Sequence, residues 1–261
     1  MLAQDRSPQL TRWRPDLMRS VRLLREFRYE QPDPDRFYSA IARDSAAQLA
    51  SYVDLDGRLM LDVGGGPGYF RDAFEALGAI YLALDADAGE LAGLGRGVPP
   101  GHPSGHLGGR TVIGSGTALP FADSSLDVTY SSNVLEHVAA PWAMADEMLR
   151  VTRPGGTVLL SYTTWYGPWG GHETSPWHFL GGRRARRRYA AKHGHEPKNK
   201  YGESLFAVTV RDGLAWAERQ DSAEVVELFP RYNPSWSWWL LRVPVLRELV
   251  TWNLVVVLRK R

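Results

Sequence analysis

A glycine-rich loop directly after a short apolar run is the feature that most constrains this fold. Residues 59–63 are apolar apart from Asp62, and glycines follow at positions 64, 65, 66 and 68. The run predicts a buried strand, and apolar residues at helical spacing from Tyr69 to Leu77 predict a helix after the loop. Glycine accepts positive φ at little cost and lets a ligand approach the backbone closely. The segment therefore predicts a strand, a ligand-binding loop and a helix.

The spacing of these glycines decides between nucleotide-binding motifs. The nicotinamide fingerprint G-x-G-x-x-G would need its third glycine at position 69, which is Tyr69, so a nicotinamide oxidoreductase is the weaker alternative. A phosphate loop would need Gly-Lys-Ser or Gly-Lys-Thr, and neither follows. Asp85 ends the next apolar run, where a carboxylate can accept hydrogen bonds from both hydroxyls of a ribose. Asp62 at the loop entrance can hold an ammonium group directly or through water, although either acid alone could instead cap a turn.

Apolar runs and helical patterns alternate along most of the chain. Strands that alternate with helices predict a parallel sheet covered on both faces. A turn is expected at 153–156, and a poorly formed helix with a surface loop at 89–109. We expect helices at 141–151 and 212–219, and further strands at 79–84, 111–113, 126–131, 157–162, 223–229 and 253–258.

Two segments fall outside this alternation. Residues 18–52 carry apolar side chains at helical spacing on both sides of a Gln-Pro-Asp-Pro-Asp break, which predicts two or three helices in an N-terminal cap over residues 1–56. Residues 163–204 are rich in Gly, Trp, His and Arg, and we interpret them as a lid or substrate insert within one domain at 57–261. The 261 residues are ample for a single large core.

Composition limits the chemistry and the location. The chain has no cysteine, which excludes disulfides, cysteine-ligated metals and a thiol nucleophile. Residues 1–20 lack the apolar core of a secretory signal, so we expect a cytoplasmic protein. The apolar residues 236–258 are interrupted by Arg242, Pro244, Arg247 and Glu248, which argues against a membrane-spanning helix.

Several motifs accompany the glycine loop in a fixed order. They comprise Asp85 and residues 61–68, 118–121, 126–128, 135–138 and 150–156. In these motifs, across residues 57–162, the chain resembles the class I S-adenosylmethionine-dependent methyltransferases of the menaquinone-methyltransferase-like branch. Residues 27–30 and 170–173 are similar to an uncharacterised actinobacterial subgroup of that branch.

The resemblance implies a Rossmann-like α/β fold with a seven-stranded, mostly parallel sheet whose last strand is antiparallel. It also implies S-adenosylmethionine as cofactor, with the methionine part over the glycine loop, the ribose on Asp85 and the adenine near residues 115–119. Ser115 stands where many relatives have an acid, and a hydroxyl makes a weaker contact to the adenine amino group. The cofactor-binding residues implied in this way are Asp62, Gly64, Gly65, Gly66, Gly68, Asp85, Ser115, Gly116, Thr117, Ala118, Leu119 and Asn133.

Methyl transfer to oxygen sets the chemistry expected of the site. The acceptor must lie in line with the sulfur–methyl bond, at about 3 Å, and an oxygen acceptor needs a general base near neutral pH. Histidine suits that role best. His137 follows the strand expected at 126–131 and His172 follows the one at 157–162, so we predict that one of them is the catalytic base. His137 could instead be structural, and we expect His178, His193 and His195 to be exposed.

The acceptor pocket is expected to form from the start of the insert. Tyr162, Trp165, Tyr166 and His172 are predicted to line it and to bind the substrate. The sequence contains no H-E-x-x-H motif or comparable carboxylate spacing, so we predict no metal site.

Two surface features leave the class of acceptor open. Arginines at 183, 184, 186, 187 and 188 give the insert a basic run, which can be a solvated face, an anion-recognition site or a membrane-facing surface. Trp236, Trp238, Trp239 and Trp252 can form an interfacial belt or pack as a hairpin on the sheet edge, which the resemblance favours. A net charge of +2 disfavours nucleic acid as a partner.

The predicted function is S-adenosylmethionine-dependent methyl transfer, with an oxygen of a small or lipid-linked molecule as acceptor. A peripheral membrane contact, without a transmembrane span, would suit such an acceptor. The alternative is a non-catalytic protein that binds S-adenosylmethionine or S-adenosylhomocysteine and recruits a partner.

Overall fold

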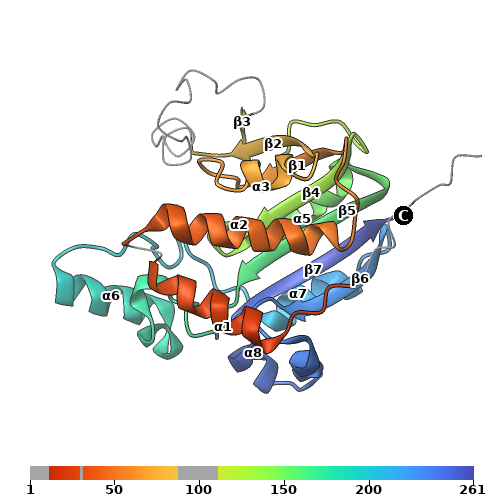
Figure 1. The fold of residues 1–261 in the computed structure, drawn as a ribbon. Coiled ribbons are helices and arrows are strands. Elements are labelled where there is room, and N and C mark those ends of the chain that lie inside the picture. Colours follow the sequence, from red (N-terminus) through yellow and green to blue (C-terminus); the bar gives the residue numbers. More distant parts are fainter. Residues whose placement is uncertain (1–11, 30–31, 88–110) are drawn as a thin grey trace, which may run out of the picture.

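The computed structural model describes residues 12–29, 32–87 and 111–261 (Figure 1). The loop expected at 89–109 lies outside these residues. The described chain forms a central sheet with helices on both faces, and the insert lies beyond the carboxyl ends of strands β4 and β5.

The sheet has seven strands in the order β3-β2-β1-β4-β5-β7-β6. Strands β1 to β5 run parallel to their neighbours in this group, whereas β7 is antiparallel to both β5 and β6. This topology confirms the sheet that the resemblance implied. The strands are β1 (Leu59–Val63), β2 (Ile80–Asp85), β3 (Thr111–Ile113), β4 (Leu126–Ser132), β5 (Thr152–Thr163), β6 (Ala223–Pro230) and β7 (Asn253–Lys260).

Helices are the other regular elements of the described fold. Asp16 and Asp33 cap the first two, because their carboxylates accept hydrogen bonds from the backbone N–H groups of Arg19 (2.7 Å) and Arg36 (3.2 Å). These two helices confirm the helical segment predicted at 18–52. The α-helices are α1 (Leu17–Glu26), α2 (Pro34–Ala50), α3 (Arg71–Glu75), α5 (Pro141–Val151), α6 (Gly182–His193), α7 (Val210–Glu218) and α8 (Leu246–Val250). The 3-10 helices are η1 (Phe27–Tyr29), η2 (Leu135–His137), η3 (His172–Thr174), η4 (Trp177–Leu180) and η5 (Ser235–Arg242).

Successive residues of the strands face opposite layers of helices. On β1, Leu61 and Val63 belong to a core shared with α5 and α7, which contribute Met144 and Trp216. Met60 belongs to the core on the other face, which includes residues of α2 and α3. Because side chains alternate along a strand, an almost continuously apolar strand fills both cores at once.

The turn expected at 153–156 is a bulge inside β5, so this prediction is wrong. Thr152 pairs with Leu126 and Thr157 pairs with Val128, so β5 advances five residues while β4 advances two. Gly155 has a φ of 76° and supplies the left-handed backbone that lets the strand bulge and continue.

The insert has its own small core. The ring of His178 packs against Trp165 with centroids 5.2 Å apart, and His178 is 0% exposed. A Cβ at Gly171 would lie 2.5 Å from His178, so a glycine is what allows the chain to close over this ring. The prediction that His178 is exposed is therefore wrong. His193 and His195, at the end of α6, are exposed as predicted.

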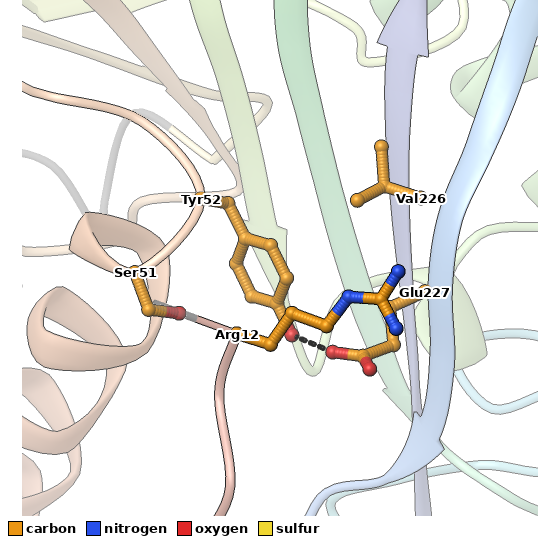
Figure 2. Close-up of a pocket in the computed structure, with 5 residues that line it drawn as sticks. All are labelled: Arg12, Ser51, Tyr52, Val226 and Glu227. Atoms are coloured by element: carbon orange, nitrogen blue, oxygen red, sulfur yellow. Dashed lines mark hydrogen bonds between the residues drawn. The ribbon is translucent and has the colours of Figure 1, made fainter. Parts of the chain in front are cut away.

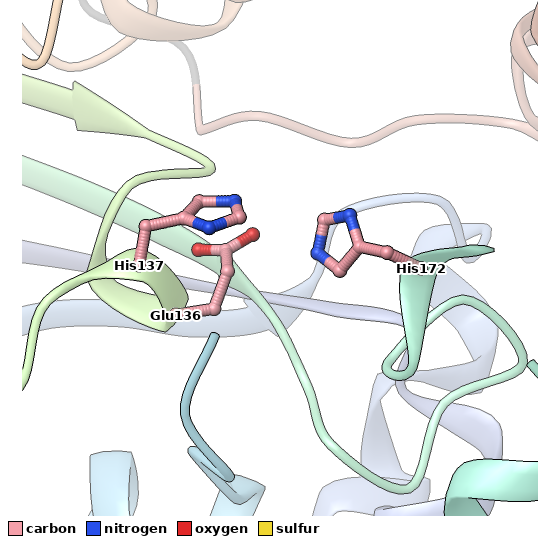
Figure 3. A group of neighbouring side chains, drawn as sticks. All are labelled: Glu136, His137 and His172. Atoms are coloured by element: carbon pink, nitrogen blue, oxygen red, sulfur yellow. The ribbon is translucent and has the colours of Figure 1, made fainter. Parts of the chain in front are cut away.

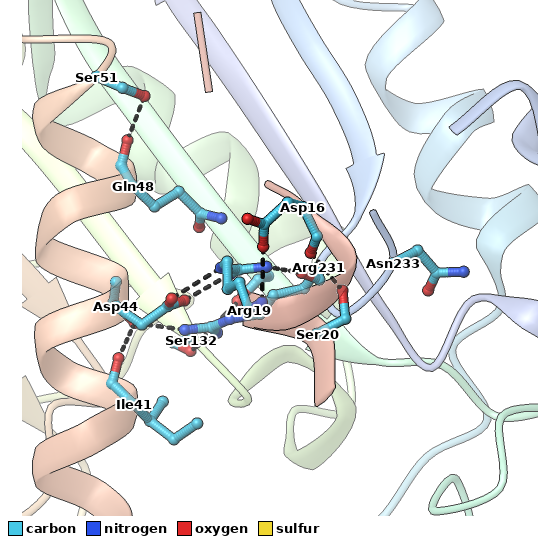
Figure 4. Close-up of polar contacts among 12 residues, drawn as sticks. Asp16, Arg19, Ser20, Ile41, Asp44, Gln48, Ser51, Ser132, Arg231 and Asn233 are labelled. Carbon is cyan, nitrogen blue, oxygen red and sulfur yellow. Dashed lines mark hydrogen bonds and ion pairs between the residues drawn. The ribbon is translucent and has the colours of Figure 1, made fainter. Parts of the chain in front are cut away.

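A buried polar network joins α1, α2 and the residue after β6 (Figure 4). Arg19 forms an ion pair with Asp44, with an Nε–Oδ1 distance of 2.8 Å, and donates to the backbone oxygen of Arg231 at 2.8 Å. Arg231 is 1% exposed and donates to the hydroxyls of Ser132 (2.7 Å) and Ser161 (3.2 Å). In the described part of the chain, this network contains the buried guanidinium groups of Arg19 and Arg231 and the carboxylate of Asp44, which pairs with Arg19.

A small pocket of about 140 Å³ lies between the end of α2 and β6 (Figure 2). Tyr52 donates a hydrogen bond to Glu227 there, and Arg14 forms an ion pair with the same carboxylate at 2.6 Å. These contacts attach the N-terminal segment to the edge of the sheet. The pocket shares no residue with the glycine loop, and we assign it to packing.

The C-terminal connection packs on the sheet edge through one of its tryptophans. Trp238 stacks on Phe229 with ring centroids 4.4 Å apart. The connection consists of η5 and α8 and joins the antiparallel neighbours β6 and β7, and it leaves Trp236 and Trp239 71% and 55% exposed. Across residues 12–29, 32–87 and 111–261, no helix has both the length and the apolar character needed to cross a bilayer.

Candidate active site

The glycine loop lies at the carboxyl end of β1, between β2 and β4. Gly64 donates its N–H to the carbonyl of Leu84 at 2.7 Å, and Gly66 donates to Oδ2 of Asp85 at 3.0 Å. The φ angles of Gly64, Gly66 and Gly68 are 81°, 49° and 84°. The loop therefore turns back toward β2, where the Asp85 carboxylate lies against it.

The loop glycines differ in what surrounds them. A Cβ at Gly66 would meet no atom within 4 Å, and one at Gly68 would meet nothing nearer than 3.9 Å. A Cβ at Gly64, in contrast, would lie 2.4 Å from the side chain of Val134. The outer part of the loop is thus open to a ligand, whereas Gly64 packs tightly against the segment that follows β4.

Asp62 is buried beneath this loop. Its carboxylate accepts a hydrogen bond from the hydroxyl of Tyr81 at 2.6 Å, and the residue is 2% exposed. Burial raises the pKa of Asp62 to about 7, although the Tyr81 hydrogen bond acts in the opposite direction. The role of Asp62 in holding an ammonium group stays a prediction.

Asp62 should make the stability of the protein depend on pH. Its pKa is about 7 in the folded state against an ordinary value of 3.8, so the folded state retains a proton that the unfolded state releases. We expect Asp62 to contribute a fall in the free energy of unfolding of up to about 1.4 kcal/mol per pH unit between about pH 4 and pH 7, against an opposite contribution from His172, whose pKa burial lowers. The Asp62→Asn variant should lack this fall, as measured by urea unfolding at several pH values. Parallel pH profiles for the two proteins would contradict the assignment.

The segment expected to hold adenine follows β3. The hydroxyls of Ser115 and Thr117 are 2.9 Å apart, and Ser115 is exposed. Leu119 is buried, with its N–H donating to Glu147 at 2.8 Å and its carbonyl accepting from Arg150 at 3.0 Å. Two side chains of α5 therefore hold this segment at the edge of the sheet.

Glu136 and His137 of η2 and His172 of η3 form a cluster (Figure 3). Each offers one carboxylate oxygen or ring nitrogen, and these atoms all lie within 4.8 Å of one another. Oε1 of Glu136 accepts a hydrogen bond from the N–H of Thr163 at 3.0 Å, and Nδ1 of His137 lies 2.7 Å from the carbonyl of Ser204. Both residues predicted as candidate bases thus meet, with their rings 5.0 Å apart.

Unusual backbone conformations bring the cluster together. Asn133 has a φ of 57° and its side chain accepts a hydrogen bond from Asn253 at 2.7 Å, which fixes the turn between β4 and η2. His172 has a φ of 47° at the start of η3. Burial lowers the pKa of His172 to about 4, so its ring is neutral near pH 7.

The N-terminal helices and the insert meet in an aromatic seam formed by Phe27, Trp169, Tyr232 and Trp252. Phe27 stacks on Trp169 with centroids 5.4 Å apart, and Trp169 contacts Trp252 at 4.9 Å. Tyr232 contacts Phe27 at 5.3 Å. His172 lies three residues after Trp169, so the seam is next to the cluster.

The other residues predicted to bind substrate lie in different surroundings and do not line one pocket together. Tyr162 is fully buried and donates its hydroxyl to the carbonyl of Thr209 at 2.8 Å, which assigns it to the packing between β5 and α7. Trp165 belongs to the core of the insert, and Tyr166 is 41% exposed. Glu136 was not among the predicted site residues, although its position next to His137 was the signal that could have identified it.

Comparisons with known proteins agree with this arrangement. Residues 61–160 match a family described as "Methyltransferase domain". A protein from Mycobacterium marinum named as an uncharacterized methyltransferase is 52% identical over 254 residues, which cover 95% of this chain and 96% of the relative.

Two solved structures share the fold. The S-adenosylmethionine-dependent methyltransferase from Mesorhizobium loti has a TM-score of 0.52 at 19% identity, covering 82% of this chain and 98% of that one. A geranyl diphosphate methyltransferase in complex with SAM has a TM-score of 0.53 at 15% identity, covering 93% and 90%. The chain therefore belongs to the methyltransferase family, and its fold is that of the S-adenosylmethionine-dependent members.

Proposed function

We propose that this methyltransferase uses S-adenosylmethionine to methylate an oxygen atom of a small or lipid-linked acceptor. The observation that carries the proposal is that the open glycine loop and the cluster of Glu136, His137 and His172 lie at the same edge of the sheet. Val134, which packs against Gly64, directly precedes η2, the helix that contains Glu136 and His137. We also propose that the protein belongs to the menaquinone-methyltransferase-like branch and to its actinobacterial subgroup.

The residues of the loop fit this cofactor. Gly66 and Gly68 present bare backbone to open space, which the methionine part can approach. Each carboxylate oxygen of Asp85 accepts one hydrogen bond, from Gly66 or from Asp87, and keeps a lone pair for a ribose hydroxyl. Ser115 is exposed where the adenine is expected. The fold shared with a methyltransferase that holds SAM supports this assignment.

The cluster supplies the acceptor side of the reaction. When bound, S-adenosylmethionine offers a sulfonium methyl group: the acceptor oxygen gives up its proton and forms the new carbon–oxygen bond, and the electrons of the broken carbon–sulfur bond stay on sulfur. Glu136, His137 and His172 hold the acceptor hydroxyl and favour loss of its proton. The aromatic seam lies next to the cluster and offers apolar side chains, which suits a partly apolar acceptor.

The class of acceptor can be determined from the fraction in which a labelled methyl group is recovered. Purified protein is incubated with methyl-labelled S-adenosylmethionine and an extract of its host, and the products are partitioned into organic, small aqueous and macromolecular fractions. Label in the organic or small aqueous fraction is the expected result, and the organic fraction would identify a lipid-linked acceptor. Label only in the macromolecular fraction would contradict a small or lipid-linked acceptor.

Substitutions in the cluster should separate catalysis from cofactor binding. We expect His137→Gln and His172→Gln each to lower kcat/KM at least about 10²-fold, because each removes a group that acts on the acceptor hydroxyl. The Kd for S-adenosylmethionine, measured by calorimetry, should stay within a few-fold. His195→Gln, at an exposed position of the insert, is the matched control. Cofactor binding without any methyl transfer by the unmodified protein would instead support a binding protein that recruits a partner.

A further inference from the structure

We propose that Glu136, His137 and His172 bind one divalent transition-metal cation between them. The sequence motifs did not suggest this site, because His172 reaches it from the insert whereas the other two residues come from η2. The three ligand atoms lie within 4.8 Å of one another. Three donors bonded to one cation at about 2.0–2.2 Å are about 3.0–3.8 Å apart, so side-chain rotations that move these atoms by about 1 Å close the site.

Two buried atoms of the cluster have no hydrogen-bond partner. These are Oε2 of Glu136, whose residue is 1% exposed, and Nε2 of His172. Buried polar atoms normally have a hydrogen-bond partner, so two unpaired atoms within one cluster indicate a place for a bound group. A cation that accepts electron pairs from both atoms satisfies them together.

The remaining contacts match those that orient metal ligands. Nδ1 of His137 lies 2.7 Å from the carbonyl of Ser204, and an N–H donated there leaves Nε2 with a free lone pair. Oε1 of Glu136 is held at 3.0 Å by the backbone N–H of Thr163, which aims the other oxygen into the cluster. Both ligands are thus fixed by backbone groups on their outer side.

The donor set indicates which cations fit. One carboxylate and two imidazoles suit Mn²⁺, Fe²⁺, Co²⁺ or Zn²⁺, and three protein ligands leave at least one coordination position open. A hydroxyl bound in that position has a lowered pKa and can release its proton to water. This second step rests on the proposed function, and it makes the two histidines ligands rather than proton acceptors. The binding of the cation itself does not depend on it.

The test is a titration of the metal-free, full-length protein with MnCl₂ and with ZnCl₂. The protein is treated with EDTA and dialysed, and binding is followed by calorimetry and by the electron paramagnetic resonance signal of free Mn²⁺. One cation should bind per chain, and Glu136→Gln or His172→Gln should weaken binding at least about 10-fold. The control is the double variant His193→Gln/His195→Gln, whose exposed rings lie 6.1 Å apart and are the alternative place for adventitious binding.

A second variant keeps the test decisive if these substitutions disturb folding. Because the chain has no cysteine, His172→Cys introduces a single thiolate that can still ligate a metal. With CoCl₂ it should give a thiolate-to-cobalt charge-transfer band, which Glu136→Gln in the same chain should weaken.

Three results would overturn the proposal: no cation bound, binding unchanged in the cluster variants, or loss of binding only in the His193→Gln/His195→Gln protein. The Kd for S-adenosylmethionine is measured on each sample without added metal. If the unmodified protein binds the metal but not S-adenosylmethionine, the proposed function is refuted and the cation site is not.

Discussion

Gly64→Ala is expected to destabilise the protein by about 2–5 kcal/mol and to abolish binding of S-adenosylmethionine. Gly64 has a φ of 81°, and a left-handed backbone costs a residue with a Cβ about 1–2 kcal/mol. The new Cβ would also lie 2.4 Å from Val134, and overpacking of this kind costs about 1–3 kcal/mol. Urea unfolding measures the first effect and calorimetric titration with the cofactor measures the second.

Gly66→Ala is the matched control for this prediction. Gly66 also has a positive φ, of 49°, but a Cβ there would meet no atom within 4 Å. Its cost should therefore be confined to the backbone, about 1–2 kcal/mol. Adding Val134→Ala to Gly64→Ala should remove the clash, so the double variant should be more stable than the sum of the two single effects implies. Equal destabilisation by Gly64→Ala and Gly66→Ala would contradict the argument.

Asp44→Asn is expected to lower the free energy of unfolding by about 3–5 kcal/mol, because removing one partner of a buried ion pair leaves the other charge uncompensated. Asp44 pairs with Arg19, and both are less than one-tenth exposed. Arg231 is 1% exposed, and its hydrogen bonds go to uncharged serine hydroxyls. Burial acts to lower the pKa of Arg231 and the negative charge of Asp44 acts to raise it, so Asp44 stabilises this second guanidinium as well. The neutral amide would leave both guanidinium groups in the interior without a counter-charge.

The matched control is Glu26→Gln, which breaks an ion pair with Arg36 near the same helices. Arg36 is 47% exposed, so water compensates for the lost partner and the change in stability should be small. Both variants are compared with the unmodified protein by urea unfolding at pH 7. The argument fails if Asp44→Asn costs no more than Glu26→Gln.

The sheet and the glycine loop were predictable because local patterns determine them. An apolar run and its following glycines specify β1 and its turn without reference to the rest of the chain. The register of β1 against β2 then brings Asp85 to the loop, because the ends of adjacent parallel strands lie together. The bulge in β5 was missed because it depends on pairing with β4, which is a contact between strands.

The candidate site was only partly predictable because one of its residues, His172, comes from the insert. His137 could be identified from its place after β4, but its closeness to His172 depends on the path of residues 163–172. The burial of His178 depends on the same path, since Gly171 closes over its ring. Tyr162 follows the alternation of β5 and packs beneath α7, so its position next to the insert in sequence was misleading.

The aromatic seam has a consequence for how the candidate site is assembled. Phe27 belongs to the N-terminal segment and Trp169 to the insert, so their stacking joins two parts of the chain that are far apart in sequence. His172 donates its N–H to the carbonyl of Trp169 at 2.8 Å, and its ring lies 5.0 Å from that of His137. The N-terminal segment therefore supports the position of His172 without contributing a residue to the cluster itself.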